Sequence, residues 1–192
     1  MSRPKGKIIV IGGAIDKGSF TESSFTDSVE GNLNQFERGI LDRIVNESKN
    51  GIDSKIEIIP TASRIPLVVG NEYVKAFQYL GVKNANILNI TNRKEANSIE
   101  TIKRIEESDV VFFTGGDQLR LTSLIGGTPI HDLIINKYLS DDFLYVGTSA
   151  GAASASKSMI YQGSSQEALL KGEIKMTSGF GLIDNVVFDT HF

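Results

Sequence analysis

The segment Gly147-Thr148-Ser149-Ala150-Gly151 has the spacing of a nucleophile elbow, G-x-S-x-G. It follows the short apolar run Phe143-Leu144-Tyr145-Val146 and leads into a stretch of small residues. In such an elbow a strand ends, the chain turns sharply and a helix begins, so the serine hydroxyl is held at the apex. Small neighbours are needed because the flanking backbones approach closely. The same pattern occurs in ordinary strand-to-helix turns, but this context favours Ser149 as a nucleophile.

The base that a serine nucleophile needs is narrowed by composition, because the chain contains two histidines. His131 follows Pro129, and proline at a helix start predicts an exposed first-turn position for this histidine. His191 follows the apolar β-type run 186–188 and comes after the serine, as in α/β-hydrolase-type sites. Open α/β sheets bind ligands at the carboxyl ends of their strands, so we favour His191. An ordinary strand-end histidine is the alternative.

A carboxylate would complete the site by holding the imidazole in one tautomer and stabilising its charged form. The acidic residues between the serine and the favoured histidine are Glu167, Glu173, Asp184 and Asp189. Their spacing does not choose among them. Asp189 would share a strand face with His191, so it is as well suited to binding substrate as to orienting the base.

A second glycine-rich turn, with the sequence Gly-Gly-Asp-Gln, follows the buried apolar run 109–114. Two glycines after a strand let the backbone turn with its N–H groups free. The N–H of Gly116 or Asp117, together with that of Ala150, would stabilise a tetrahedral oxyanion. The side chain of Gln118 would reach a substrate amide or carboxylate. A plain glycine-rich turn between a strand and a helix is the alternative.

The elements that must position these residues alternate between strand and helix, which predicts a doubly wound parallel sheet. Short apolar segments predict strands at 7–11, 55–59, 86–90, 109–114, 143–146 and 186–188. Apolar residues at helical spacing predict amphipathic helices within 33–45, 73–80 and 99–105. Polar composition predicts loops at 17–32 and 162–178. The turn at Gly12-Gly13 lacks the third glycine of a Rossmann motif and the lysine of a Walker loop.

The composition fits a single soluble enzyme domain of 192 residues with a formal net charge of −3. This charge and the lack of a long basic stripe argue against nucleic-acid binding. Cysteine is absent, which excludes disulfides, thiolate metal sites and a cysteine nucleophile. The two histidines lie far apart, so we expect neither a metal nor a cofactor. The apolar runs are too short for a membrane span or a signal peptide, which favours a cytoplasmic protein without membrane partners.

Three ordered motifs resemble those of the cyanophycinases, in the serine peptidase family that also holds the α-aspartyl dipeptidases. They lie at residues 113–121, 147–152 and 189–192, and residues 12–17 also look like a cyanophycinase opening. The resemblance runs over nearly the whole chain. It implies a class I glutamine-amidotransferase-like (flavodoxin-like) three-layer α/β sandwich with a mostly parallel sheet. It also implies hydrolysis of β-aspartyl-arginine units of the storage polymer cyanophycin by a Ser-His-Glu triad.

The same resemblance assigns roles to individual residues. Ser149 and His191 match the family's nucleophile and base, and Glu167 falls where the family places its acid. Gln118 and Asp189 match positions that contact substrate. The partner implied is therefore a peptide that contains aspartyl residues, and the resemblance also suggests a homodimer.

Two departures from the family pattern bear on these expectations. Thr190 stands where cyanophycinases commonly carry glutamine, so the substrate contact at this position differs. The chain also stops one residue after His191, whereas family members continue with an arginine-bearing segment. We therefore expect a single α/β peptidase domain over 1–192 that lacks this segment. The alternatives are an α-aspartyl dipeptidase-type serine peptidase, or a catalytically silent or incomplete fragment of the family.

Overall fold

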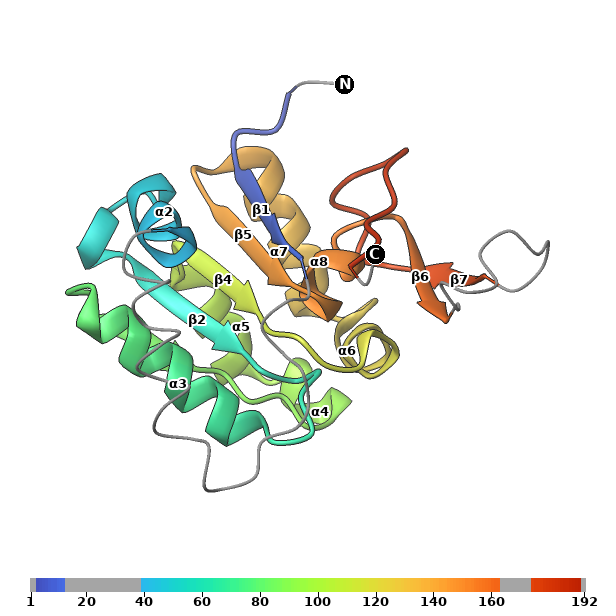
Figure 1. The fold of residues 1–192 in the computed structure, drawn as a ribbon, viewed down its shortest axis with the longest axis horizontal. Helices are drawn as coiled ribbons and strands as arrows, with labels where there is room; N and C mark the ends of the chain where they lie inside the picture. The colour runs from blue at the N-terminus through green and yellow to red at the C-terminus, as the bar shows by residue number, and fades with distance from the viewer. Residues whose placement is uncertain (1–2, 13–38, 163–173, 191–192) are drawn as a thin grey trace.

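The computed structural model describes residues 3–12, 39–162 and 174–190, in which helices cover both faces of a parallel sheet (Figure 1). The sheet has five strands in the order β1-β5-β4-β2-β3, and every neighbouring pair is parallel. The strands are β1 (Lys7–Ile11), β2 (Lys55–Ile59), β3 (Asn84–Ile87), β4 (Val110–Phe113) and β5 (Leu144–Thr148). The expected three-layer α/β sandwich is confirmed.

Alternation along the strands divides the buried side chains between two cores. On β4, Val110 and Phe112 belong to one core, whereas Val111 and Phe113 belong to the other. The first core includes buried residues of α2 and α3, and the second includes residues of α4 to α7. These helices are α2 (Ile40–Glu47), α3 (Pro66–Tyr79), α4 (Arg93–Ala96), α5 (Ile99–Glu107), α6 (Gln118–Ile125) and α7 (Pro129–Ser140). A short 3-10 helix, η2 (Gly51–Asp53), leads into β2.

The predicted helical stripes fall in α2, α3 and α5, although Leu33 and Phe36 of the first stripe lie outside the described residues. Helix α5 begins where the Ser98 hydroxyl accepts the N–H of Thr101 at 3.1 Å, which caps the first turn. Its buried Ile105 then packs in the second core. Local capping and apolar spacing therefore agree with the observed helix.

The strand order places the carboxyl ends of β2 and β4 next to each other. From β2 the chain passes through α3 to the outer strand β3, whereas from β4 it passes through α6 and α7 to β5. These crossovers run in opposite directions and cover opposite faces of the sheet. The loops after β2 and β4 therefore lie where an open α/β sheet forms its ligand crevice. The turn after β5, the other neighbour of β4, lies at the same edge.

Three expectations about strands need correction. The segment 162–178, predicted to be a loop, begins at the last residue of β6 (Ser158–Gln162) and ends with its antiparallel partner β7 (Lys175–Ser178). Residues 186–188, predicted to be a strand, form none: Val186 and Val187 are exposed, and Phe188 alone packs against the core. Apolar residues form a strand only where a sheet edge is available to pair with them. Strand β3 begins and ends earlier than predicted, at Asn84 and Ile87.

Candidate active site

Ser149 lies between the end of β5 and helix α8 (Ala150–Ser154), with φ 49° and ψ −106°. A positive φ is strained for a residue with a Cβ, so the surrounding structure must hold it. The Ser149 N–H donates to the carbonyl of Ile11, the last residue of β1, at 3.0 Å. Its carbonyl accepts the N–H of Ala153 at 2.9 Å within the first turn of α8. The strained strand–turn–helix geometry predicted from the G-x-S-x-G spacing is therefore present.

The two glycines of this elbow are required by close contacts between backbones. A Cβ on Gly147 would lie 2.3 Å from the carbonyl carbon and oxygen of Gly151. A Cβ on Gly151 would lie 2.4 Å from the carbonyl oxygen of Phe113, the last residue of β4. Helix α8 thus runs directly against β5 and β4, and any side chain at either glycine would force it away from the sheet.

Beneath the elbow, Tyr145 of β5 supports α8 through its buried hydroxyl. This hydroxyl donates to the carbonyl of Gly151 at 2.8 Å and lies 3.2 Å from the Ser154 Oγ. Burial raises the pKa of Tyr145 far above its ordinary value, so the group stays protonated and can donate. The sequence pattern predicts Tyr145 only as a residue of an apolar strand. A tyrosine in a buried strand signals that its hydroxyl has a hydrogen-bond partner, although it does not identify that partner.

The turn after β4 contains the candidate donors for an oxyanion. Gly116 has φ 137°, and a Cβ there would lie 2.1 Å from the carbonyl oxygen of Ala62, so only glycine fits. The Asp117 N–H donates to that same carbonyl at 2.9 Å. The Gly116 N–H, in contrast, makes no hydrogen bond within the described part of the chain. Gly116 and Asp117 were the two predicted oxyanion donors. The Asp117 N–H already has an acceptor, so the Gly116 N–H is the better candidate of the two.

Ala150, the other expected donor, is the first residue of α8. The first N–H groups of a helix have no acceptor within the helix, so the Ala150 N–H is available at the turn that carries Ser149. Gly116 and Ala150 follow adjacent strands, β4 and β5. A serine hydroxyl on a strained turn, with two such backbone donors from neighbouring strand ends, is suited to acyl transfer.

Asp117 and Gln118 connect this turn to its surroundings. The Asp117 Oδ1 accepts the N–H groups of Leu119 and Arg120, at 2.8 and 3.0 Å, and so caps α6. The Gln118 Nε2 donates to the carbonyl of Ile160 in β6 at 3.2 Å. Gln118, which we expected to contact substrate, therefore also joins α6 to the β6–β7 pair.

His131 is not the exposed first-turn residue that the sequence predicted, because its side chain is only 16% exposed. Its Nδ1 accepts the N–H of Gly127 at 3.1 Å, and its Nε2 lies 2.9 Å from the carbonyl oxygen of Phe180. Because Nδ1 accepts a hydrogen bond, the proton lies on Nε2 and donates to that carbonyl. Both ring nitrogens are engaged, so His131 is unsuited to act as the base for Ser149.

Phe180 links this histidine to the elbow. Its ring centroid lies 5.3 Å from that of His131 and 5.4 Å from that of Phe113 at the end of β4. Its N–H donates at 2.6 Å to the carbonyl of Ser154, the last residue of α8. The segment after β7 is thereby anchored against α8 before it continues toward residues 189–190. The sequence held no signal for this anchor, because His131 and Phe180 are 49 positions apart.

The structure distinguishes among the candidate acids only in part. Asp184 is exposed and pairs with Lys157 at 3.2 Å on the surface, an arrangement that does not resemble a buried triad acid. Glu167 and Glu173 lie outside the described residues. The triad acid thus stays a prediction.

The remaining predicted site residues lie at the end of the chain. Asp189 is exposed and Thr190 is partly buried. We expected Asp189 and His191 to share a strand face, but residues 186–188 form no strand, so this reason for placing them together is wrong. His191 itself lies outside the described residues.

Within residues 3–12, 39–162 and 174–190, no three histidine, cysteine or acidic side chains gather where they could hold a metal ion. No helix in these ranges has the length and apolar character to cross a membrane.

Known proteins are similar to this chain in sequence and in fold. The profile of peptidase family S51 matches residues 28–192. Cyanophycinase from Geminocystis herdmanii (strain PCC 6308) is 35% identical over 188 residues, which are 98% of this chain and 62% of that protein. Cyanophycinase from Trichormus variabilis (strain ATCC 29413 / PCC 7937) is 38% identical over 137 residues, which are 71% of this chain and 46% of that protein. The aligned part thus spans between 46% and 62% of the length of these relatives.

A solved structure is similar over most of the chain. The crystal structure of a peptidase from an acI-B1 Actinobacterium gives a TM-score of 0.60 at 21% identity. The similarity covers 96% of this chain and 67% of that one. At this identity it bears on the fold alone, and it agrees with the flavodoxin-like arrangement described above.

Proposed function

Because the chain belongs to peptidase family S51, we propose that it is a serine peptidase that releases β-aspartyl-arginine units from cyanophycin. The observation that carries this proposal is Ser149 at φ 49° on the turn between β5 and α8, beside the glycine turn that follows β4. The choice of substrate is supported by the two relatives described above, both of which are cyanophycinases.

In the proposed mechanism, His191 takes the proton from the Ser149 Oγ as this oxygen attacks the peptide carbonyl beside an aspartyl residue. The N–H groups of Gly116 and Ala150 stabilise the tetrahedral oxyanion, and one such donor typically contributes ~3 kcal/mol to transition-state stabilisation. His191 then protonates the leaving amine, and water hydrolyses the acyl-enzyme. Glu167 orients the imidazole and stabilises its charged form.

Three further residues would contact the substrate. Gln118 comes from the start of α6, whereas Asp189 and Thr190 come from the segment anchored by Phe180. A second candidate function, an α-aspartyl dipeptidase-type peptidase, is favoured by Thr190, because a threonine hydroxyl cannot make the amide contacts of glutamine.

The test is release of β-aspartyl-arginine from cyanophycin, with α-aspartyl dipeptides assayed in parallel. We expect release by the unsubstituted protein, and a fall of about a million-fold in kcat for Ser149→Ala, because removing a serine nucleophile has an effect of this size. Equal release by both proteins would reject Ser149 as the nucleophile. A serine-directed fluorophosphonate probe adds a second readout. Labelling of Ser149 without cyanophycin cleavage would favour another peptide substrate, and no labelling would favour a catalytically silent chain.

The acid is tested by Glu167→Gln, with Glu173→Gln as the matched control from the same segment. Loss of the carboxylate that orients the imidazole should lower kcat by about 10⁴-fold for Glu167→Gln. The control should keep its activity. An unaffected rate for Glu167→Gln would assign the acid to another residue.

A further inference from the structure

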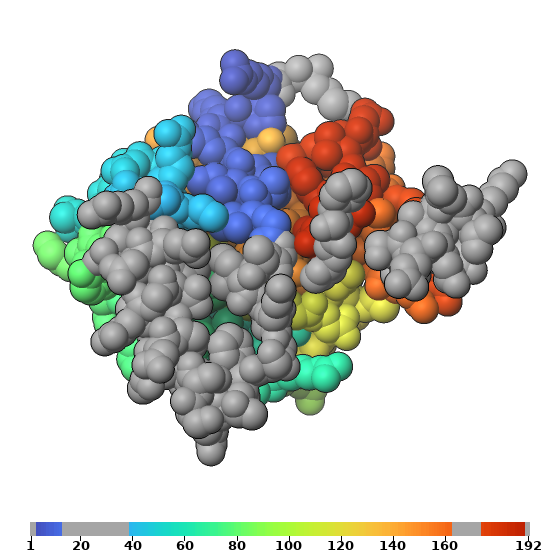
Figure 2. Space-filling model, viewed as in Figure 1, coloured from blue at the N-terminus to red at the C-terminus, as the bar shows by residue number. Residues whose placement is uncertain are grey.

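A groove of about 880 Å³ lies along α6. It is lined by Asp117 at the start of this helix and by Ser178 and Gly179 at the end of β7. Figure 2 shows the surface of α6, in yellow, beside the orange surface of the β6–β7 region. The groove therefore adjoins two segments of the candidate active site, namely the glycine turn that holds Gly116 and the segment that leads to residues 189–190.

Arg120 is the cationic residue of this groove, and its side chain is partly buried. Within the described ranges the Arg120 guanidinium makes no hydrogen bond or ion pair, although the backbone of this residue does. Arg93, which reaches the end of α6, differs in this respect, because it donates to the carbonyls of Ser123 and Gly126 at 2.7 and 3.0 Å. A partly buried guanidinium without a partner has five donors available and suits a planar carboxylate.

Acceptors line the same groove. The hydroxyls of Thr122 and Ser123 donate within α6, to the carbonyls of Gln118 and Arg120, at 3.0 Å each. Their oxygen lone pairs are then available to accept hydrogen bonds. The Asp117 carboxylate adds a negative charge at the end nearest the glycine turn. The groove thus offers a cation for a carboxylate, and acceptors for a ligand that also carries N–H donors.

We propose that this groove binds the part of an extended aspartyl peptide that lies beyond the two units flanking the cleaved bond, with Arg120 binding a carboxylate of that part. The proposal rests on the proposed function and extends it to longer substrates. A β-aspartyl-arginine unit carries both a carboxylate and a guanidinium, which match the donors and acceptors of the groove. Ser149 does not line the groove, so Arg120 contributes to binding and not to bond cleavage.

The experiment compares cyanophycin with a peptide of two β-aspartyl-arginine units, which has one cleavable bond between units. Arg120→Gln should raise the KM for cyanophycin about tenfold, as expected for loss of a charge-assisted hydrogen bond. The kcat should not change, and the KM for the two-unit peptide should change less than about twofold. The matched control is Arg43→Gln on α2, whose side chain is 72% exposed and pairs with Glu47, and it should change neither KM.

Binding to the inactive Ser149→Ala protein separates this proposal from the proposed function. A fluorescent cyanophycin fragment should bind Ser149→Ala about tenfold more tightly than Ser149→Ala/Arg120→Gln, whether or not the active protein cleaves it. If the active protein does not cleave cyanophycin but this difference in binding is observed, the proposed function is rejected and the proposed role of the groove in binding is supported. Equal binding by the two proteins, or an equal rise in KM for both substrates, would overturn the groove proposal.

Discussion

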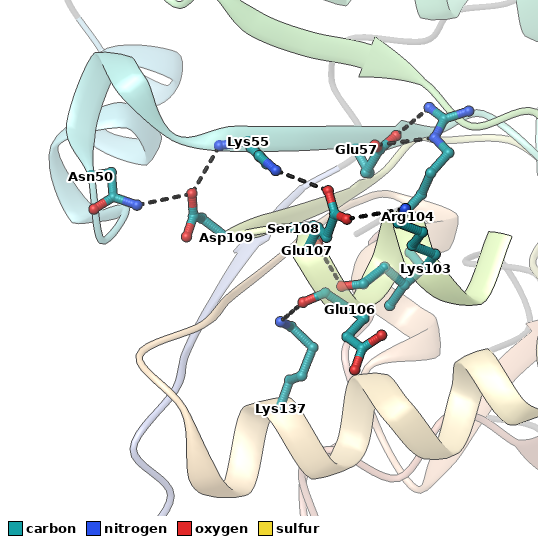
Figure 3. A network of polar contacts seen from close by, with 11 residues as sticks. Asn50, Lys55, Glu57, Lys103, Arg104, Glu106, Glu107, Ser108, Asp109 and Lys137 are labelled. Carbon is teal, nitrogen blue, oxygen red and sulfur yellow. Dashed lines mark hydrogen bonds and ion pairs between the residues drawn. The ribbon is translucent and has the colours of Figure 1, made fainter. Parts of the chain in front are cut away.

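The two edges of the sheet are built in different ways. At the carboxyl edge, glycines bring backbones into direct contact, as where Gly151 lies against Phe113 and where the Asp117 N–H donates to Ala62. At the amino edge, charged side chains connect the strands to the helices (Figure 3). At the edge that carries the candidate site, the backbones pack so closely that an added atom would not fit. At the opposite edge, ion pairs connect the elements, and water can solvate most of these charges equally well.

Lys55, the first residue of β2, illustrates the amino edge. Its N–H donates to the Asp109 carboxylate at 2.9 Å, and its Nζ pairs with Glu107 at the end of α5, also at 2.9 Å. Lys137 of α7 donates to the carbonyl of Glu106 at 2.6 Å. The side chains of Lys55 and Glu107 are 54% and 48% exposed, so their ion pair gains little over solvation by water.

Gly151→Ala should give the largest loss of stability, because the added Cβ would lie 2.4 Å from the carbonyl oxygen and 2.7 Å from the Cβ of Phe113. Neither atom belongs to a flexible side-chain end, so the helix must move. We expect the free energy of unfolding, measured with urea, to fall by about 3 kcal/mol. The control is Gly12→Ala, where a Cβ meets no atom of the described residues within 4 Å and the change should stay within about 0.5 kcal/mol. Because both glycines lie at the carboxyl edge, equal effects would show that close backbone contact does not determine the cost of an added Cβ there.

Arg104→Gln should have the next largest effect, because it breaks the most buried ion pair among the contacts of Figure 3. Glu57 on β2 is buried, and Arg104 also donates to the carbonyl of Ile87 at 2.9 Å. Removing the cation leaves a buried carboxylate unpaired. Since Arg104 is partly exposed, we expect a loss of about 2 kcal/mol at pH 8, below the value for fully buried pairs.

The pH dependence of that loss gives a sharper test. Burial raises the pKa of Glu57, and Arg104 opposes this shift. A carboxyl group whose pKa is higher in the folded than in the unfolded state makes the protein less stable as the pH rises above the unfolded pKa, which is about 4.5. The difference between Arg104→Gln and the unsubstituted protein should therefore be larger at pH 8 than at pH 5. Urea unfolding at both values measures it, and the double variant Glu57→Gln/Arg104→Gln should remove this dependence on pH.

Ser149→Gly should produce a smaller effect of opposite sign. The φ of 49° is strained for serine or alanine and is readily adopted by glycine. After subtraction of the larger chain entropy of unfolded glycine, we expect Ser149→Gly to be about 0.5 kcal/mol more stable than Ser149→Ala. Thermal unfolding of the two inactive variants makes the comparison without interference from activity. A less stable glycine variant would mean that the elbow stores no strain.

Lys55→Gln should have the smallest effect. The ion pair that it removes joins two half-exposed side chains, and the N–H of residue 55 would still donate to Asp109. We expect an unfolding midpoint that equals that of the unsubstituted protein within experimental error. A loss as large as that for Arg104→Gln would mean that the exposed charges hold the amino edge together.

Much of the fold was predictable because its determinants are local. The strands β1 and β2 coincide with their predicted ranges, since both read as short apolar runs in the sequence. The elbow at Ser149 was predictable for a similar reason, because glycine spacing and the preceding strand are both visible in the sequence.

The features that were missed depend on partners distant in the chain. The Asp117 N–H donates its hydrogen bond to the carbonyl of Ala62, which belongs to the loop after β2. The hydrogen bond of the His131 Nε2 depends on Phe180, 49 positions away. The pairing of β6 with β7 depends on two segments that are separated by twelve residues, and β7 lies in a stretch whose polar composition alone indicated a loop. Such contacts follow from the tertiary arrangement, and residue type and spacing do not encode them locally.

The excursion through β6 and β7 leaves and rejoins the domain at one place. The Lys157 N–H donates to the carbonyl of Ile183 at 2.9 Å, and the Ile183 N–H donates to the carbonyl of Ala155 at 3.1 Å. These two hydrogen bonds fasten the ends of the excursion to each other, so a change in the number of residues between β6 and β7 does not by itself move the start of β6 away from Ile183. The excursion also contains Phe180, which contacts α8, and Glu167, the proposed acid. Its length is therefore free to vary where its contents are not: a relative can lengthen or shorten the chain between the two strands, but exchanging the whole excursion would replace part of the proposed catalytic machinery.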